Sequence, residues 1–263
     1  MIKACGRYCI NGVIKMKKPV RIALCCICAA ILAFSAYKII SIAAEYGKAE
    51  SVYEDTANQA VTVVETSQTD ASKPPITVDL AALQSENSSI IGWIYCEGTP
   101  INYPVVQSTD NEYFVRRMPD GTRNQAGSIF MDYRCSPTCQ DTNTIIYGHN
   151  MKNGSMFASL KSFSSQSFYD AHPVVWFFTP AQTYRVELVA GYVTSTSSEA
   201  FEMFTDRENM LSFLNSAVSK SSFVSTVDPA GVEQVMTLAT CSYEYDAARY
   251  VLIGSIVPIE GGI

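Results

Sequence analysis

The sequence predicts a mainly β fold, an antiparallel barrel or sandwich, that follows an apolar segment near the N-terminus. Short strand-like runs alternate with turn signals, one run alternates apolar and polar residues, and a single helical pattern interrupts the series. Of the 263 residues, 48% are hydrophobic and 17% charged, which suits one sizeable core rather than a disordered chain. Eight strand-like runs are expected, at residues 90–95, 101–106, 128–132, 144–147, 174–178, 184–193, 234–238 and 250–257.

The first element is an apolar segment at residues 22–44, whose 23 positions exceed the roughly 20 that cross a bilayer. Six basic and no acidic residues lie in residues 1–21, whereas the rest of the chain has 13 basic and 25 acidic residues. The positive-inside rule therefore predicts a cytoplasmic leader, a single-pass transmembrane signal-anchor and an external body. A cleaved secretory signal stays open as the alternative, because residues 41–44 resemble a small-residue cleavage site.

Residues 45–75 predict a polar stalk that links this anchor to the folded body. They are rich in small and polar residues and end on Lys73 and two prolines, so we expect helix early and an extended chain at the end. The folded body is expected at residues 76–263, beginning with a short helix capped by Asp79. The body is acidic and offers no basic face, so no nucleic-acid partner is expected.

The later elements are one clear strand and one helix. Tyr184, Val186 and Leu188 alternate with charged residues, which is the period of a half-buried strand. Thr205 and Glu208 have the spacing of a capping box. An amphipathic helix of about four turns is expected over residues 206–219, inserted between late strands, where it would cover the barrel and wall a groove beside the cysteine at position 241. Its apolar face comprises Met210, Leu211, Leu214, Ala217 and Val218.

Three side chains of catalytic type fall at predicted strand edges. Cys241 follows a strand-like run near the C-terminus, Arg249 opens the next run, and His149 ends an upstream run. A thiol attacks as the thiolate, which a neighbouring imidazolium stabilises, and arginine stays charged and can hold an oxyanion. Antiparallel pairing of the strands on either side of the Cys241 loop would bring Cys241 and Arg249 to the same barrel end.

Each of these residues has a structural alternative when taken alone. An arbitrary cysteine is more often a small buried hydrophobe, a lone histidine can satisfy a loop carbonyl, and Arg249 can pair with Asp246. Chain order excludes a papain-like enzyme, because His149 precedes Cys241 and the thiol ends a strand instead of opening a helix. An anchored adhesin with an incidental cysteine is the non-enzymatic alternative.

Two other features carry no catalytic prediction. Cys135 and Cys139 flank a proline turn without a second ligand pair, so a zinc site is not expected, and an exposed loop disulfide stays open. His172 lies in a polar approach to a strand and is interpreted as structural or exposed. We find neither a Gly-rich phosphate loop nor a metal cluster in the sequence, so neither cofactor nor metal is expected.

Taken together, these residues resemble the sortases, and more closely the class B sortases, which are cysteine transpeptidases of Gram-positive cell surfaces. The T-L-x-T-C signature appears at residues 237–241, Y-G-H at residues 147–149, and the arginine after the cysteine as Arg249. The likeness extends over nearly all of residues 76–263. The helix at residues 206–219 falls where class B members carry one between their sixth and seventh strands.

The resemblance implies a closed eight-stranded sortase-type β-barrel with N-terminal helices. Cys241 would cleave a pentapeptide sorting signal after its Thr, near the C-terminus of a secreted protein, through a thioester. The signal would be N-P-Q-T-N-like or S/P-P-x-T-G-like. His149 would act as general acid and then general base, and Arg249 would steady the oxyanion. The acceptor would be an amine of the peptidoglycan precursor (lipid II), or a pilin amine; a peptidase that uses water is the rival.

The resemblance also implies which residues contact the substrate. These are Asn111, Thr196, Phe201, Ala239 and Thr240. Ser242 stands where some relatives have an acidic residue after the cysteine, so the sorting signal and the acceptor stay open. Anchoring versus pilus assembly and the oligomeric state also stay open.

Overall fold

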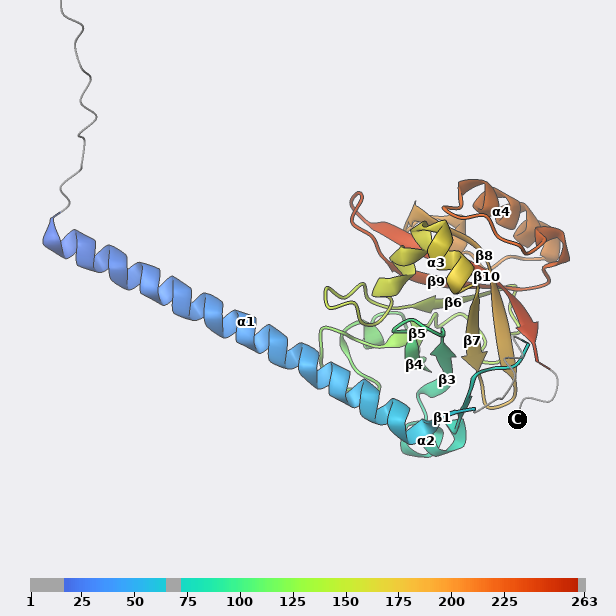
Figure 1. Ribbon diagram of the computed structural model, residues 1–263, viewed down its shortest axis with the longest axis horizontal. Helices are drawn as coiled ribbons and strands as arrows, with labels where there is room; N and C mark the ends of the chain where they lie inside the picture. Colours follow the sequence, from blue (N-terminus) through green and yellow to red (C-terminus); the bar gives the residue numbers. More distant parts are fainter. Residues whose placement is uncertain (1–16, 65–71, 260–263) are drawn as a thin grey trace, which may run out of the picture. The chain divides into compact units, whose positions relative to one another are not determined.

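The computed structural model describes residues 17–64 and 72–259 (Figure 1). The chain divides into two compact units, with the boundary between Glu45 and Tyr46. Most of the basic leader (residues 1–16) and part of the predicted stalk (residues 65–71) lie outside the described residues. The domain boundaries expected from the sequence stay predictions. Each unit is described by itself.

The first unit consists of the N-terminal part of helix α1 (Lys18–Ala60), in which the apolar segment forms the larger share (Figure 1). The most apolar 18-residue window has a mean hydropathy of 2.2 and is fully exposed. The helix is therefore long and apolar enough to cross a membrane.

The second unit begins with the C-terminal part of α1, where Ala49, Tyr53 and Ala60 are buried. Two short strands, β1 (Val61–Val63) and β2 (Ile76–Val78), then pair antiparallel. Helix α2 (Leu80–Glu86) follows, and the Asp79 side chain accepts a 2.9 Å hydrogen bond from the Ala82 amide, as the sequence predicts for an N-cap.

Eight strands close into a barrel in the order β10-β8-β7-β3-β4-β5-β6-β9, which confirms the barrel and excludes the sandwich. All eight predicted runs are strands, with bounds that shift by up to three residues. The all-antiparallel expectation is wrong, because β4 pairs with β5 and β6 with β9 in parallel. The strands are β3 (Ile90–Tyr95), β4 (Asn102–Val106), β5 (Ile129–Met131), β6 (Asn143–Tyr147), β7 (Val174–Phe178), β8 (Thr183–Ser195), β9 (Val235–Cys241) and β10 (Ala248–Pro258).

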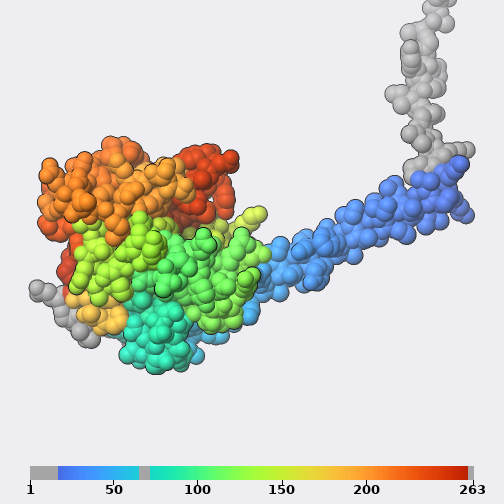
Figure 2. All heavy atoms as spheres, turned by 180° about the vertical axis from the view of Figure 1, so that it is seen from behind, coloured from blue at the N-terminus to red at the C-terminus, as the bar shows by residue number. Residues whose placement is uncertain are grey.

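The predicted amphipathic helix is α4 (Arg207–Lys220), in the orange segment that covers one side of the domain in Figure 2. Its cap differs from the prediction. Asp206, and not Thr205, is the N-cap, and its carboxylate accepts a 2.8 Å hydrogen bond from the Asn209 amide. The remaining helices are short: η1 (Tyr113–Arg116), η2 (Ala158–Ser164), α3 (Gln166–Ala171), η3 (Glu199–Phe201) and η4 (Pro229–Gly231).

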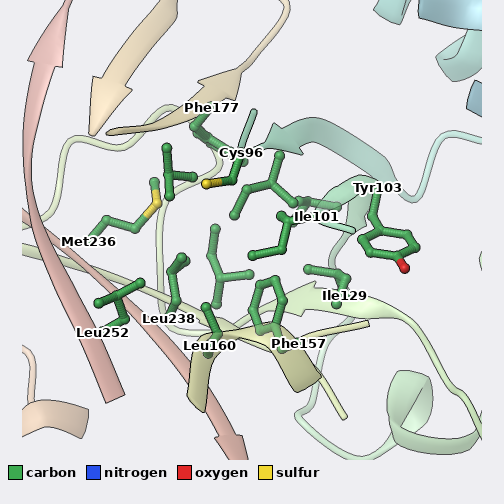
Figure 3. Packing of buried hydrophobic residues seen from close by; sticks show 14 of the residues in the cluster. Cys96, Ile101, Tyr103, Ile129, Phe157, Leu160, Phe177, Met236, Leu238 and Leu252 are labelled. Atoms are coloured by element: carbon green, nitrogen blue, oxygen red, sulfur yellow. The ribbon is translucent and has the colours of Figure 1, made fainter. Parts of the chain in front are cut away.

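Strand alternation divides the core into two layers. In β9, Met236 and Leu238 point into the barrel lumen, where Figure 3 shows them with Leu160 and Leu252. Val235 and Ala239, which flank these two residues, point outward and pack in the cluster that contains the apolar face of α4. Each large aliphatic side chain buried in this way contributes about 1.5–3 kcal/mol, so the strand ends are held in a rigid frame.

Candidate active site

Three strand ends meet at one end of the barrel and carry the three predicted catalytic residues. In the parallel pair β6–β9, Tyr147 lies opposite Ala239, so His149 and Cys241 each follow two residues after that register point. In the antiparallel pair β9–β10, Arg249 lies directly opposite Cys241. Side chains at directly opposed positions lie on the same face of a sheet with their Cβ atoms about 5 Å apart.

A cavity of about 490 Å³ opens at this end of the barrel. Its lining contains every site residue that the sequence singles out, from five separate segments of the chain. The structure thus brings these residues together, whereas their individual roles stay predictions. They are Asn111, His149, Thr196, Phe201, Ala239, Thr240, Cys241 and Arg249.

Cys241 differs in its surroundings from the other cysteines of the second unit. It is half-buried at the cavity, whereas Cys96, Cys135 and Cys139 are buried and unpaired. Burial raises the pKa of each of these three thiols to about 12, so they stay protonated and inert. The structure therefore does not contain the exposed disulfide between Cys135 and Cys139 that the sequence left open.

The loop after β6 contains His149 and also binds the main chain of Cys241. The His149 Nε2 atom donates a 2.6 Å hydrogen bond to the Val115 carbonyl. A carbonyl only accepts, so Nε2 carries a proton and Nδ1 is the nitrogen left for proton exchange. The neighbouring Asn150 side-chain amide donates a 2.8 Å hydrogen bond to the Cys241 carbonyl. The other histidine, His172, contacts the Glu97 carbonyl and lies outside the cavity lining.

Arg249 is half-buried and its guanidinium is not neutralised locally. Its NH1 atom donates a 3.0 Å hydrogen bond to the Ala248 carbonyl, and within the described ranges 17–64 and 72–259 it has no carboxylate in an ion pair. The pairing with Asp246 that the sequence left open is not formed. A cation without a local partner at a cavity is available to a carbonyl oxygen or an oxyanion.

Asp132, at the end of β5, is a central residue of the cavity that the sequence reasoning missed. Its side chain is fully buried, and Tyr147 and Asn111 each donate a 2.9 Å hydrogen bond to it. Arg134 adds an ion pair and hydrogen bonds to both carboxylate oxygens. Burial alone would raise the pKa of Asp132, but hydrogen bonds from Arg134, Tyr147 and Asn111 hold it at about 2. A polar residue directly after an apolar strand was the only signal in the sequence.

This buried carboxylate fixes the wall of the cavity. Arg134 NH2 also donates a 3.0 Å hydrogen bond to the Phe201 carbonyl, which ties the segment between β8 and α4 to the end of β5. The Phe201 ring stacks on Tyr147 with ring centroids 6.1 Å apart. Thr240 is buried at the cavity, and its hydroxyl has no hydrogen-bond partner in the described part of the chain.

Within residues 17–64 and 72–259, no group of three or more His, Cys, Asp and Glu side chains is placed to hold a metal ion. The chemistry that the described cavity residues offer is that of a thiol, an imidazole and a free guanidinium.

Comparison with known proteins identifies similar domains. The family model described as "Sortase domain" matches residues 94–257. Sortase B of Listeria monocytogenes serovar 1/2a is 37% identical over 182 residues, which cover 68% of this chain and 74% of that protein. A crystal structure of sortase B from Bacillus anthracis is 34% identical, with a TM-score of 0.69 over 82% of this chain and all of that one. A Staphylococcus aureus sortase B–substrate complex is 31% identical, with a TM-score of 0.64 over 68% of this chain and 85% of that one.

Proposed function

The chain belongs to the sortase family, in its class B, and is a cysteine transpeptidase; from that premise we propose that it cleaves a C-terminal sorting signal after Thr and transfers the protein to a cell-wall amine. The signal is of the N-P-Q-T-N or S/P-P-x-T-G type. The observation that carries the proposal is the meeting of Cys241, His149 and Arg249 in one cavity.

In the first half of the reaction the Cys241 thiolate attacks the carbonyl carbon of the signal's Thr. Arg249 stabilises the negative charge that develops on the carbonyl oxygen. His149 then donates a proton to the leaving amine as the peptide bond breaks, and a thioester between Cys241 and the Thr remains. The Val115 carbonyl orients the imidazole, in the role that a carboxylate has in other nucleophile–base pairs.

In the second half an acceptor amine attacks the thioester carbonyl. His149 takes the proton from this amine, a new peptide bond forms as the C–S bond breaks, and Cys241 leaves as the thiolate. A sortase B has been crystallised in complex with triglycine, which supports an amine of a glycine peptide in the peptidoglycan precursor as acceptor. A pilin amine, which would make the enzyme a pilin polymerase, or water is the alternative acceptor.

The predicted substrate contacts fit an extended peptide in the cavity. Phe201 and Thr196 lie on the segment between β8 and α4, and Ala239 and Thr240 line the cavity from β9. Asn111 already donates to Asp132 through its amide nitrogen, so it would use its remaining amide hydrogen for the substrate. The helix α1 anchors the enzyme, with the catalytic domain on the external face where secreted substrates emerge.

The direct test incubates the full-length protein in detergent with a panel of signal pentapeptides. We expect cleavage after Thr, a mass adduct on Cys241 and, with triglycine present, a ligated product. Cys241→Ala should abolish cleavage and adduct, whereas His149→Ala and Arg249→Ala should each reduce kcat/KM by about 10³-fold or more. An active Cys241→Ala protein would overturn the assignment.

Matched variants separate catalysis from folding. His172→Ala removes the second histidine of the chain, which lies outside the cavity, and should keep nearly full activity. Arg249→Lys keeps the charge but loses the planar guanidinium, so an intermediate loss is expected. Cleavage that stays purely hydrolytic with every amine offered would favour the peptidase, and a Cys241 inert to thiol reagents would favour the adhesin.

A further inference from the structure

Tyr53 lies on the part of α1 that packs against the barrel, and it is only 5% exposed. Its hydroxyl donates a 2.6 Å hydrogen bond to the carbonyl of Gly127. Its ring meets the ring of Tyr103 edge to face, with centroids 5.3 Å apart. Burial raises the pKa of the Tyr53 hydroxyl, so the group stays a donor. These contacts fasten α1 to two segments that are distant in the sequence.

Gly127 lies directly against the segment that holds the histidine ring. Its φ is +57°, and a Cβ atom at this position would lie 2.3 Å from the Val115 carbonyl oxygen and 2.9 Å from that of Phe114. Only glycine permits this close approach of two main chains. The Val115 carbonyl is the group that accepts the hydrogen bond from His149 Nε2. If Gly127 moves, the Val115 carbonyl should move with it and change the position of the imidazole.

Tyr103 connects Tyr53 to the other side of the same histidine. The Tyr103 ring lies at the edge of the lumen cluster (Figure 3), and its hydroxyl accepts a 3.0 Å hydrogen bond from the Met156 amide. Met156 forms a β-bridge with Asn150 and has a φ of +58°. The next amide along the chain donates a 2.9 Å hydrogen bond to the His149 carbonyl. Both the ring and the main chain of the histidine are thus held by segments that contact Gly127 or Tyr103, the two residues that Tyr53 binds.

We propose that Tyr53 is a positioning residue for His149, which makes the end of α1 beyond the membrane segment a part of the catalytic framework. The inference rests on the proposed function, because it concerns the proton transfers assigned to His149. Proton transfer requires hydrogen-bond distances, and a displacement of about 1 Å can cost about 10²-fold in rate. Tyr53 does not line the cavity, so its loss should change the chemical step and leave substrate binding unchanged.

The test is Tyr53→Phe in the full-length protein in detergent. This substitution removes the hydroxyl and keeps the ring. We expect kcat for peptide cleavage, measured per reactive Cys241, to fall about tenfold, with KM unchanged within about twofold. Tyr169→Phe is the control, because Tyr169 is 2% exposed and lies outside the cavity lining. Its hydroxyl donates to Ser225 and accepts from the Thr226 amide, each at 3.1 Å.

The control distinguishes positioning from general stability. Both variants lose one buried hydroxyl and should lower the melting temperature by similar amounts. A lower kcat in Tyr53→Phe alone supports the proposal. Equal kcat in the two variants, or a change in KM without a change in kcat, overturns it. Failure of the wild-type protein to cleave any signal would instead contradict the proposed function.

Discussion

Asp132 and Cys241 line the same cavity but have different surroundings. Asp132 is buried, but three neighbouring side chains donate to its carboxylate and hold its pKa at about 2. It cannot act as a proton donor near neutral pH, so it acts through the positions of the residues that it binds. Cys241 has its carbonyl held by Asn150 and its side chain open to the cavity.

Asp132→Asn is expected to lower the free energy of unfolding by about 2 kcal/mol near neutral pH, because Arg134 loses its carboxylate partner. The folded-state pKa lies below the unfolded value, so this contribution is complete above about pH 5 and disappears as the pH falls toward 2. Urea unfolding at a series of pH values should show the gap between wild type and variant closing over that window. Asp120→Asn, at an exposed turn, is the control and should show no such gap. For Asp132→Asn, a gap that persists unchanged at about pH 2 would contradict the role of the ion pair.

At this scale the sequence predicted which residues meet in the cavity and missed the residues that support them. The cysteine, histidine and arginine are recognisable because their motifs have fixed spacing and chain order. Asp132 and Val115 act through contacts with residues distant in the chain, and Val115 acts only through its main-chain carbonyl. A main-chain acceptor leaves no trace in residue type, so no pattern in the sequence could indicate it.

Elements were predicted well where local patterns decide them and less well where pairing decides them. Apolar runs and turn residues identified all eight barrel strands, but the direction of pairing depends on how long connections return the chain. The parallel pair β6–β9 is the important case, because it brings His149, just after β6, and Cys241, the last residue of β9, to the same barrel end. The sequence suggested the β9–β10 pairing but gave no information on β6–β9.

The start of α4 offers a direct test of local prediction. The sequence pattern assigns the cap to Thr205 and Glu208, whereas in the structure Asp206 accepts the Asn209 amide. Asp206→Ala is expected to lower the free energy of unfolding by about 1 kcal/mol, and Glu208→Ala by no more than about 0.5 kcal/mol. Chemical denaturation of both variants measures the two values. The reverse order would restore the capping box and contradict the structural assignment.

At the scale of the whole molecule, α1 contains both the apolar segment and, further along the chain, the residues that pack against the barrel. It runs without interruption from Lys18 to Ala60, from the apolar segment through the candidate cleavage site at residues 41–44 to the buried contacts of Tyr53. Cleavage at that site would require the helix to open, and would leave the catalytic domain without its anchor. The uncleaved anchor stays the prediction, and the mature N-terminus tests it.

We expect the mature enzyme to keep residues 1–44 and to place its catalytic domain outside the cell. If the catalytic domain were in the cytoplasm, the six basic residues of the leader would have to cross the bilayer. The positive-inside rule disfavours that orientation. Intact mass of the membrane-extracted protein should include the leader. Protease added to intact cells should digest the catalytic domain and spare an N-terminal tag, whereas both should be digested after the cells are lysed. A mature N-terminus at residues 44–45, or a domain protected in intact cells, would show that α1 does not serve as a lasting anchor and would confine its role to the packing of Tyr53.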